Sequence, residues 1–193
     1  YLKILALDAP NLTHTKKIDR MFSYTQINAN INHWDVSEVE SMHGLFMGNE
    51  VYNQPMDKWN TSKVFNMSNM FEFATSFNQP IGSWDVSSVT NMMEMFYNAT
   101  NFNQPLDTWN VTRVKDMTRM FLYANAFVQD ISKWDFSGIK HCLTTRESSE
   151  QNCITYIFSY SNINLERKEK YGWLETMFED EYVPANYTQG KKD

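Results

Sequence analysis

The sequence has few of the residues from which catalytic and metal centres are usually built. It contains 2 cysteines and 4 histidines among 193 residues. The spacing of Cys142 and Cys153 is not a zinc signature, and the histidines lack ligand spacing such as His-Glu-x-x-His. No convergent acid, base and nucleophile stand out. We therefore expect no enzyme activity, no cofactor and no metal site.

Long runs of one residue type are also missing. The formal net charge is −6, and no Lys/Arg block is present that would neutralise a series of phosphates. Nucleic acid is therefore not expected as a partner. No apolar run approaches the roughly 20 residues that cross a bilayer, so no membrane span is expected. The first residues lack Met and the regions of a signal peptide, which suggests a processed chain or a piece of a longer one.

What the sequence does contain is a 25-residue repeat, in a chain long enough for one domain with a buried core. Tryptophans mark the period: Trp34, Trp59, Trp84, Trp109 and Trp134. Met or Cys follows eight residues after each Trp, and a Met-Phe or Leu-Phe pair follows in most units. We predict that these slots form ladders in the core, with Met92 against Met67 and Met117, and Phe96 against Phe71 and Phe121.

Both ends of the array depart from the pattern. In a degenerate first unit, Pro10 stands in the tryptophan slot, and Asn11, Leu12 and Thr13 follow it in register. The pattern ends after Cys142. We predict an N-terminal strand or cap at 1–9, a solenoid at 10–142, a C-terminal cap with a helix at 143–181, and a tail at 182–193.

Apolar spacing within one unit predicts its elements. In residues 89–102 the apolar positions fall at i, i+3, i+6 and i+7, which is typical of a helix with one buried face. A Ser or Thr such as Ser87 precedes the stripe as a predicted N-cap, and Pro80 ends the previous helix. Residues 81–86 can then form a short strand near Trp84. The predicted fold is α/β: a leucine-rich-repeat-like solenoid with one short parallel strand and one helix per repeat, plus a C-terminal cap.

The repeat unit resembles a known family. Residues 77–92, with their Phe-Asn-Gln-Pro and Trp-Asp-Val-Ser blocks, and the pair Met95-Phe96 closely resemble the Mycoplasma-lipoprotein-type repeat, which is grouped with BspA-like, leucine-rich-repeat-like surface proteins. The resemblance covers about residues 10–142. It implies an α/β solenoid used at surfaces, in bacterial lipoproteins, protists, algae and large DNA viruses, without catalytic activity. Val128-Gln129-Asp130 departs from Asn-Gln-Pro.

Two polar columns allow alternative interpretations. The Asp or Asn that follows each Trp, as in Asp85, could collect calcium or could cap turns through backbone hydrogen bonds. The Asn-Gln pairs could contact a ligand or form an internal amide ladder.

Two covalent features are also possible. Among six Asn-x-Ser/Thr motifs, Asn98 and Asn186 are the best glycosylation candidates. Cys142 and Cys153 are either two buried thiols or a disulfide that holds the C-terminal cap on the last repeat.

These features favour a non-enzymatic repeat module for protein–protein interaction or adhesion, at a cell surface or outside the cell. The alternative is a structural component of a larger assembly, such as a virion shell or envelope, with assembly neighbours as partners. Outward positions run from acidic at Glu38 and Glu40 to basic at Arg113 and Lys115, which either orients a charged partner or is ordinary solvated surface. Phe65 is an aromatic residue among polar equivalents, and we predict that Phe65 and Arg113 contact the partner.

Overall fold

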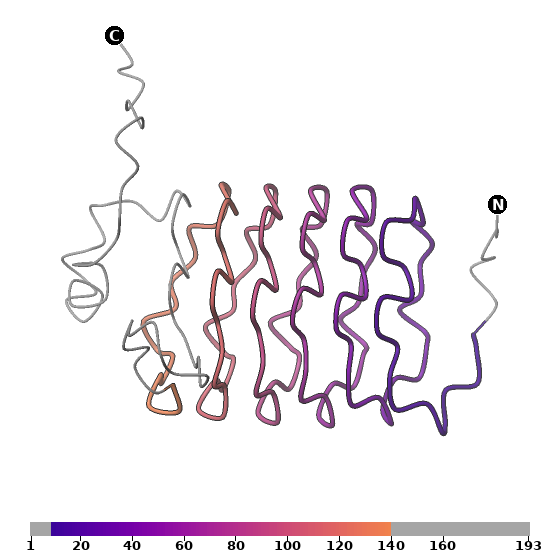
Figure 1. The fold of residues 1–193 in the computed structure, drawn as a ribbon, viewed down its shortest axis with the longest axis horizontal. Coiled ribbons are helices and arrows are strands. Elements are labelled where there is room, and N and C mark those ends of the chain that lie inside the picture. Colours follow the sequence, from indigo (N-terminus) through magenta and orange to yellow (C-terminus); the bar gives the residue numbers. More distant parts are fainter. Residues whose placement is uncertain (1–8, 140–193) are drawn as a thin grey trace, which may run out of the picture. The chain divides into compact units, whose positions relative to one another are not determined.

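A computed structural model describes residues 9–139, in which successive stretches of chain lie side by side as coils (Figure 1). Each coil takes up one repeat, because its bonded neighbours lie about one period away in sequence. The predicted cap segments, the tail, Cys142, Cys153 and Asn186 lie outside the described residues.

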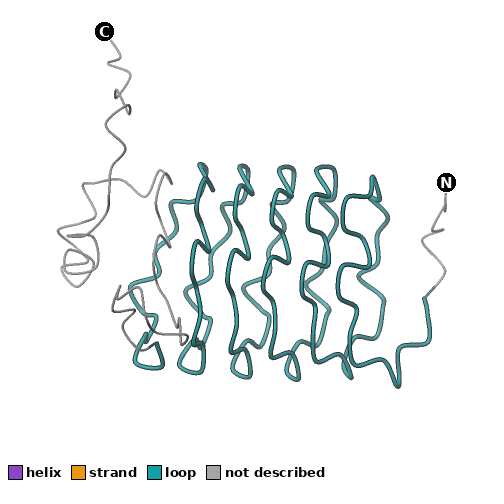
Figure 2. Cartoon of the chain, in the orientation of Figure 1, coloured by secondary structure: helices purple, strands orange, loops and turns teal. Residues whose placement is uncertain are grey.

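The predicted α/β architecture is wrong. Residues 9–139 contain no helix and no extended strand, and turns and loops make up each coil (Figure 2). Isolated parallel β-bridges connect the coils: Lys17 to Ser41, Ser41 to Asn66, Asn66 to Asn91, and Asn91 to Asp116. These bridges lie seven residues after the tryptophan slot rather than at it. The repeat period is therefore confirmed, whereas the helices and the strands at the tryptophans are not.

The predicted helix is replaced by what we call the turn leg, residues 67–74 in one coil and their equivalents in the others. Every second N–H group donates to a carbonyl of the next coil, at 2.8 to 2.9 Å: Met67, Asn69, Phe71 and Phe73. The N–H groups of Met70, Glu72 and Ala74 donate to the carbonyl three residues back. The Ser68 N–H donates to Asn66 Oδ1 at 3.0 Å. Bonds three residues long close β-turns, so successive turns take the place of helical bonds.

Positive φ angles explain why a helix cannot form here. Asn69 and Phe73 have φ of 57° and 55°, and the equivalent pair Gly44 and Gly48 has 58° and 67°. The left-handed region is incompatible with a right-handed helix. Apolar spacing of three and four residues fits consecutive four-residue turns as well as helical turns, which is why the spacing alone was misleading.

A second stretch, residues 78–84 and their equivalents, which we call the tryptophan leg, is joined to its neighbour by side chains. Asn53 Oδ1 accepts from the Asn78 backbone N–H at 2.9 Å and from Gln79 Nε2 at 2.8 Å. Trp84 Nε1 donates to the Met56 carbonyl at 2.9 Å. The same bonds recur in neighbouring coils, which confirms the predicted amide ladder.

Stacked aromatic rings fill the space between the legs. Phe96 stacks on Phe71 at 5.7 Å and on Phe121 at 5.4 Å between ring centroids. Trp59 stacks on Trp84 at 6.3 Å. The phenylalanine ladder is confirmed, and the methionines of the predicted ladder, such as Met92, are fully buried.

The serines predicted as N-caps have another role. The Ser87 N–H donates to Asp85 Oδ1 at 3.0 Å, and Ser62 does the same with Asn60 at 3.2 Å. These are turns closed by the Asp or Asn side chain, as one of the two interpretations predicted. The Thr13 N–H bonds to Asn11 Oδ1 in the same way, which confirms the register of the degenerate first unit.

Candidate interaction surface

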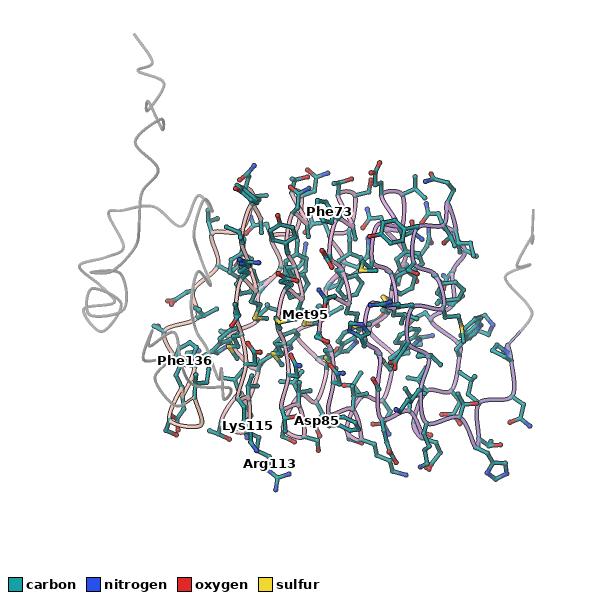
Figure 3. All side chains as sticks on the ribbon, in the orientation of Figure 1. Phe73, Asp85, Met95, Arg113, Lys115 and Phe136 are labelled. Atoms are coloured by element: carbon teal, nitrogen blue, oxygen red, sulfur yellow. The ribbon has the colours of Figure 1, made fainter. Side chains whose placement is uncertain are left out.

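The predicted contact residues lie where the chain enters the turn leg. Backbone bonds place one residue from each coil in a column: the Phe65 N–H donates to the Glu40 carbonyl, Thr90 to Phe65, and Lys115 to Thr90, each at 2.9 Å. Figure 3 shows Arg113 and Lys115 near the same end of the coils as Asp85, whereas Phe73 lies near the other end. We call Phe65, Ser88, Thr90, Arg113 and Lys115 the Phe65 surface.

Phe65 combines a fixed backbone with an open side chain. Its carbonyl accepts from Thr90 N–H and from Thr90 Oγ1, the latter at 3.2 Å. Phe65 is 43% exposed, although the neighbouring Val64 is fully buried. An aromatic ring held on a rigid backbone loses little conformational freedom when a partner covers it.

Salt bridges change the predicted charge gradient. Glu38 bonds to Lys63 and to Lys16, the latter at 3.3 Å, and Glu40 bonds to Lys16 at 3.0 Å. Hydrogen bonds from Lys63, and then from Lys16, lower the pKa of Glu38. Hydrogen bonds to Glu40, and then to Glu38, raise the pKa of Lys16. The acidic end is therefore neutralised by its neighbours.

The basic end has no such compensation. Arg113 and Lys115 are exposed, and neither has a salt bridge within residues 9–139. The surface therefore runs from neutral to basic, with Phe65 between the two parts. Among the described residues, the neighbouring slots hold the neutral side chains of Ser88 and Thr90, so no described carboxylate neutralises Arg113 or Lys115.

A second polar cluster lies on the turn leg and was missed from the sequence. Asn69 Nδ2 donates to Glu72 at 2.8 Å and to Glu94 at 2.9 Å, and Arg119 donates to Glu94 at 3.2 Å. Burial and the charge of Glu94 raise the pKa of Glu72, although the Asn69 bond opposes this. Asn69, Glu94 and Arg119 occupy one slot in successive units, and this register was the available signal.

Within residues 9–139, two buried polar side-chain atoms have no hydrogen-bond partner, Trp34 Nε1 and the Tyr52 hydroxyl. Tyr52 is fully buried in the slot that holds Phe77, Phe102 and Phe127, and its hydroxyl makes no hydrogen bond. Burial raises the pKa of Tyr52. Its ring stacks on Phe46 at 3.9 Å, so the ring contributes to the core while the hydroxyl opposes it.

Only some of the remaining predicted site residues lie within residues 9–139. Asn98 is half-buried with φ of 54°, and its backbone N–H donates to the Leu122 carbonyl at 2.8 Å. Its glycosylation stays a prediction. Among residues 9–139, no group of three or more His, Cys, Asp or Glu side chains is placed to hold a metal ion. In the same residues no helix is long and apolar enough to cross a membrane.

Comparison with known families identifies the repeat. The family described as Mycoplasma protein of unknown function, DUF285, matches residues 3–88 and again residues 53–153. The chain belongs to this family. No curated protein and no solved structure matches the chain. The predicted Mycoplasma-type repeat is thus confirmed. The second of the two overlapping matches continues to residue 153, past the predicted end of the array at residue 142.

Proposed function

We propose that this chain is a non-enzymatic repeat module that binds a protein partner at a cell surface or outside the cell, as the resemblance to BspA-like surface proteins implies. The observation that carries the proposal is the Phe65 surface. It joins Phe65, which is 43% exposed, to two cations that form no salt bridge within residues 9–139, on a backbone held by coil-to-coil hydrogen bonds. Aromatic and Arg side chains contribute most to many protein interfaces.

The charge of this surface defines the partner's chemistry. Arg113 and Lys115 favour an anionic patch, and Phe65 favours an apolar side chain next to it. Because both cations are exposed, their contribution is screened by salt. Binding through this surface is therefore expected to weaken as ionic strength rises, with an apolar remainder from Phe65.

Two substitutions test the proposal. Phe65→Ser removes the ring, and Arg113→Glu reverses one charge; each is used as bait in extracts of the native source, and the retained proteins are quantified by mass spectrometry. Matched controls are Tyr24→Ser, which removes a 70% exposed aromatic ring elsewhere, and Lys58→Glu, a charge reversal on the tryptophan leg. We expect both test variants, but neither control, to lose the same proteins while their thermal midpoints stay unchanged. Equal retention by all four variants would exclude the Phe65 surface.

The alternative function is a structural component of a larger assembly, such as a virion shell or envelope. It is favoured by the first described coil, where Met21 occupies a core slot and yet is 42% exposed. Recovery of the chain at a fixed ratio to other proteins in a purified particle would support this alternative, and its recovery alone on a cell surface would support the binding module.

A further inference from the structure

Two Asn-x-Ser/Thr motifs lie in the turns that follow a tryptophan. Their asparagines, Asn60 and Asn110, are exposed, although the next residue in each coil is buried. Each Oδ1 atom accepts from the backbone N–H and the hydroxyl two residues on, which are those of Ser62 at 3.2 and 2.8 Å and of Thr112 at 3.2 and 2.7 Å. Within residues 9–139 the Nδ2 atoms of both asparagines make no hydrogen bond. The fold therefore uses the oxygen of each amide and leaves its nitrogen free.

The turn itself does not require an asparagine. The same slot holds aspartate in three other coils, and Asp85 Oδ1 accepts from the Ser87 N–H at 3.0 Å. The equivalent bonds at Asp35 and Asp135 are 3.0 and 2.9 Å long. All three are shorter than the 3.2 Å bonds of the two asparagines, as expected for a charged acceptor. The turn alone therefore does not explain why two coils carry an amide nitrogen.

The other described motifs are less open. Asn66 is half-buried and takes part in parallel bridges to the coils on both sides. Asn98 is also half-buried and lies on the turn leg with left-handed backbone geometry. Asn11 makes the same turn as the two exposed asparagines, but residues outside the described range adjoin it. Because a glycan is bulky and needs a surface loop, the fold favours the two exposed motifs after the tryptophans.

We propose that Asn60 and Asn110 carry N-linked glycans, an inference that rests on the proposed location of the chain outside the cell. The co-substrate is an oligosaccharide joined to a polyprenyl diphosphate. Nδ2 forms a bond to C1 of the first sugar, the bond from C1 to the diphosphate oxygen breaks, and the diphosphate leaves with its lipid. The displaced amide proton passes to a base of the transferring enzyme. Oδ1 is unchanged by this reaction, so the turn keeps both of its hydrogen bonds.

The spacing of the two sites leaves room for both glycans. Asn60 and Asn110 stand two coils apart, with Asp85 in the coil between them. Neighbouring parallel strands lie about 4.8 Å apart, so coils joined by parallel bridges place the two sites about 10 Å from each other. Figure 3 shows Asp85 near the same end of the coils as Arg113. The glycans therefore border the Phe65 surface and restrict which partners reach it.

Peptide mapping of the chain from its native source tests the proposal. Mass spectrometry of intact peptides, with fragmentation that keeps the sugar attached, locates any glycan whatever its composition. We expect glycans on Asn60 and Asn110 and none on Asn66. Absence of both from a chain found on the cell surface would overturn this proposal but not the proposed function. An unmodified chain found only inside the cell would overturn both, and a glycan on Asn66 or Asn98 alone would overturn the site assignment.

Matched substitutions separate the glycan from the turn. Asn60→Asp and Asn110→Asp keep the Oδ1 acceptor, as Asp85 does, whereas Ser62→Ala keeps the asparagine and destroys the motif. Expressed in the native source, each variant is expected to lose the mass of one glycan and to keep a cooperative thermal transition. Asn98→Asp is the control and should keep both glycans. Masses unchanged apart from the substitution itself would mean that the amides only separate the like charges of neighbouring aspartates, and would overturn the proposal.

Discussion

The two legs of each coil are attached to their neighbours by different chemistry. In the turn leg, backbone N–H groups bond to backbone carbonyls, as Asn69 does to Met93 at 2.8 Å. In the tryptophan leg, the side chains of Asn53, Gln79 and Trp84 take part in each contact. Backbone bonds form with any residue except proline, whereas the side-chain bonds require particular residues. The tryptophan leg therefore repeats Asn, Gln and Trp, and the turn leg varies freely on its outer side.

The strongest test of this difference is the core of the tryptophan leg. Trp84→Ala removes a ring that stacks on Trp59 at 6.3 Å and an Nε1 donor to the Met56 carbonyl. We expect a loss of about 3–5 kcal/mol in unfolding free energy, because a cavity of this size cannot close. Chemical denaturation measures the loss. Trp84→Phe keeps an aromatic ring and is expected to lose clearly less unfolding free energy. An equal loss in both variants would show that ring stacking does not account for the stability.

A matched pair of alanine substitutions compares the legs directly. Asn78→Ala removes the Oδ1 that accepts from the Asn103 N–H at 2.9 Å and from Gln104 Nε2 at 3.0 Å. The Asn103 N–H then loses its acceptor, whereas Gln104 Nε2 keeps the backbone carbonyl of residue 78 at 3.1 Å, and we expect a cost of about 1–3 kcal/mol. Met93→Ala in the turn leg leaves the bond from Asn69 intact and should cost below about 1 kcal/mol. Thermal or denaturant unfolding of both variants decides this, and equal costs would remove the distinction between the legs.

The single hydroxyl in an otherwise apolar ladder offers a stabilising change. Tyr52→Phe removes the buried hydroxyl without a partner and keeps the ring that stacks on Phe46 at 3.9 Å. We expect a gain of about 1 kcal/mol, since an unsatisfied buried polar group opposes folding. Phe77→Tyr at the equivalent slot is the reverse control and should destabilise. A lower thermal midpoint for Tyr52→Phe would reveal a partner for the hydroxyl.

The smallest expected effect is the pH dependence of stability, which compares Glu72 of the turn leg with Asp85, the residue directly after the tryptophan leg. Burial, as the main cause, raises the pKa of Glu72 above its ordinary 4.5, so the folded state binds the proton more tightly and stability falls as pH rises through that window. Hydrogen bonds from Ser87 lower the pKa of Asp85 below 3.8, so its contribution is present above that pH and is lost on acidification.

Glu72→Gln should therefore remove a decline in stability with rising pH, and Asp85→Asn should remove an increase, each within about 0.5 kcal/mol. Unfolding measured from pH 3 to pH 7, about the range in which carboxyl groups titrate, would show the two slopes. Slopes of the same sign would contradict the assignment. Asn60 already occupies the slot equivalent to Asp85 and makes the same backbone bond, so the substitution is structurally mild.

The 25-residue period and the phenylalanine ladder were predicted from residues that recur in register. The turns closed by Asp85 and the amide ladder from Asn53 were each one of two interpretations that the sequence left open. The path of the backbone could not be predicted from the sequence, because apolar spacing does not reveal whether an N–H group bonds within its own coil or to the next coil. One local feature argued against a helix: Gly44 and Gly48 stand four residues apart inside a predicted helix, where each glycine is unfavourable.

The candidate surface shows the same limit. The sequence singled out Phe65 through its polar equivalents, and its 43% exposure agrees with an outward position. The pairing of Glu38 with Lys16 and Lys63 was not foreseen, because slot positions do not give side-chain directions. Because of these salt bridges, the end of the surface that was predicted to be acidic is neutral.

The opposed directions of the two sets of coil-to-coil bonds have an electrostatic consequence. In one coil, four N–H groups point forward: Met67, Asn69, Phe71 and Phe73. Five N–H groups of the next coil point back: the backbone groups of Asn78, Thr90 and Asn91 and the side-chain groups of Gln79 and Trp84. Their dipoles oppose one another, whereas in a helix the dipoles point the same way and add up to about half an elementary charge at each end. Lengthening the array therefore adds less field along its axis than lengthening a helix does, which leaves charged side chains such as Arg113 and Lys115 to dominate the potential that an approaching molecule meets.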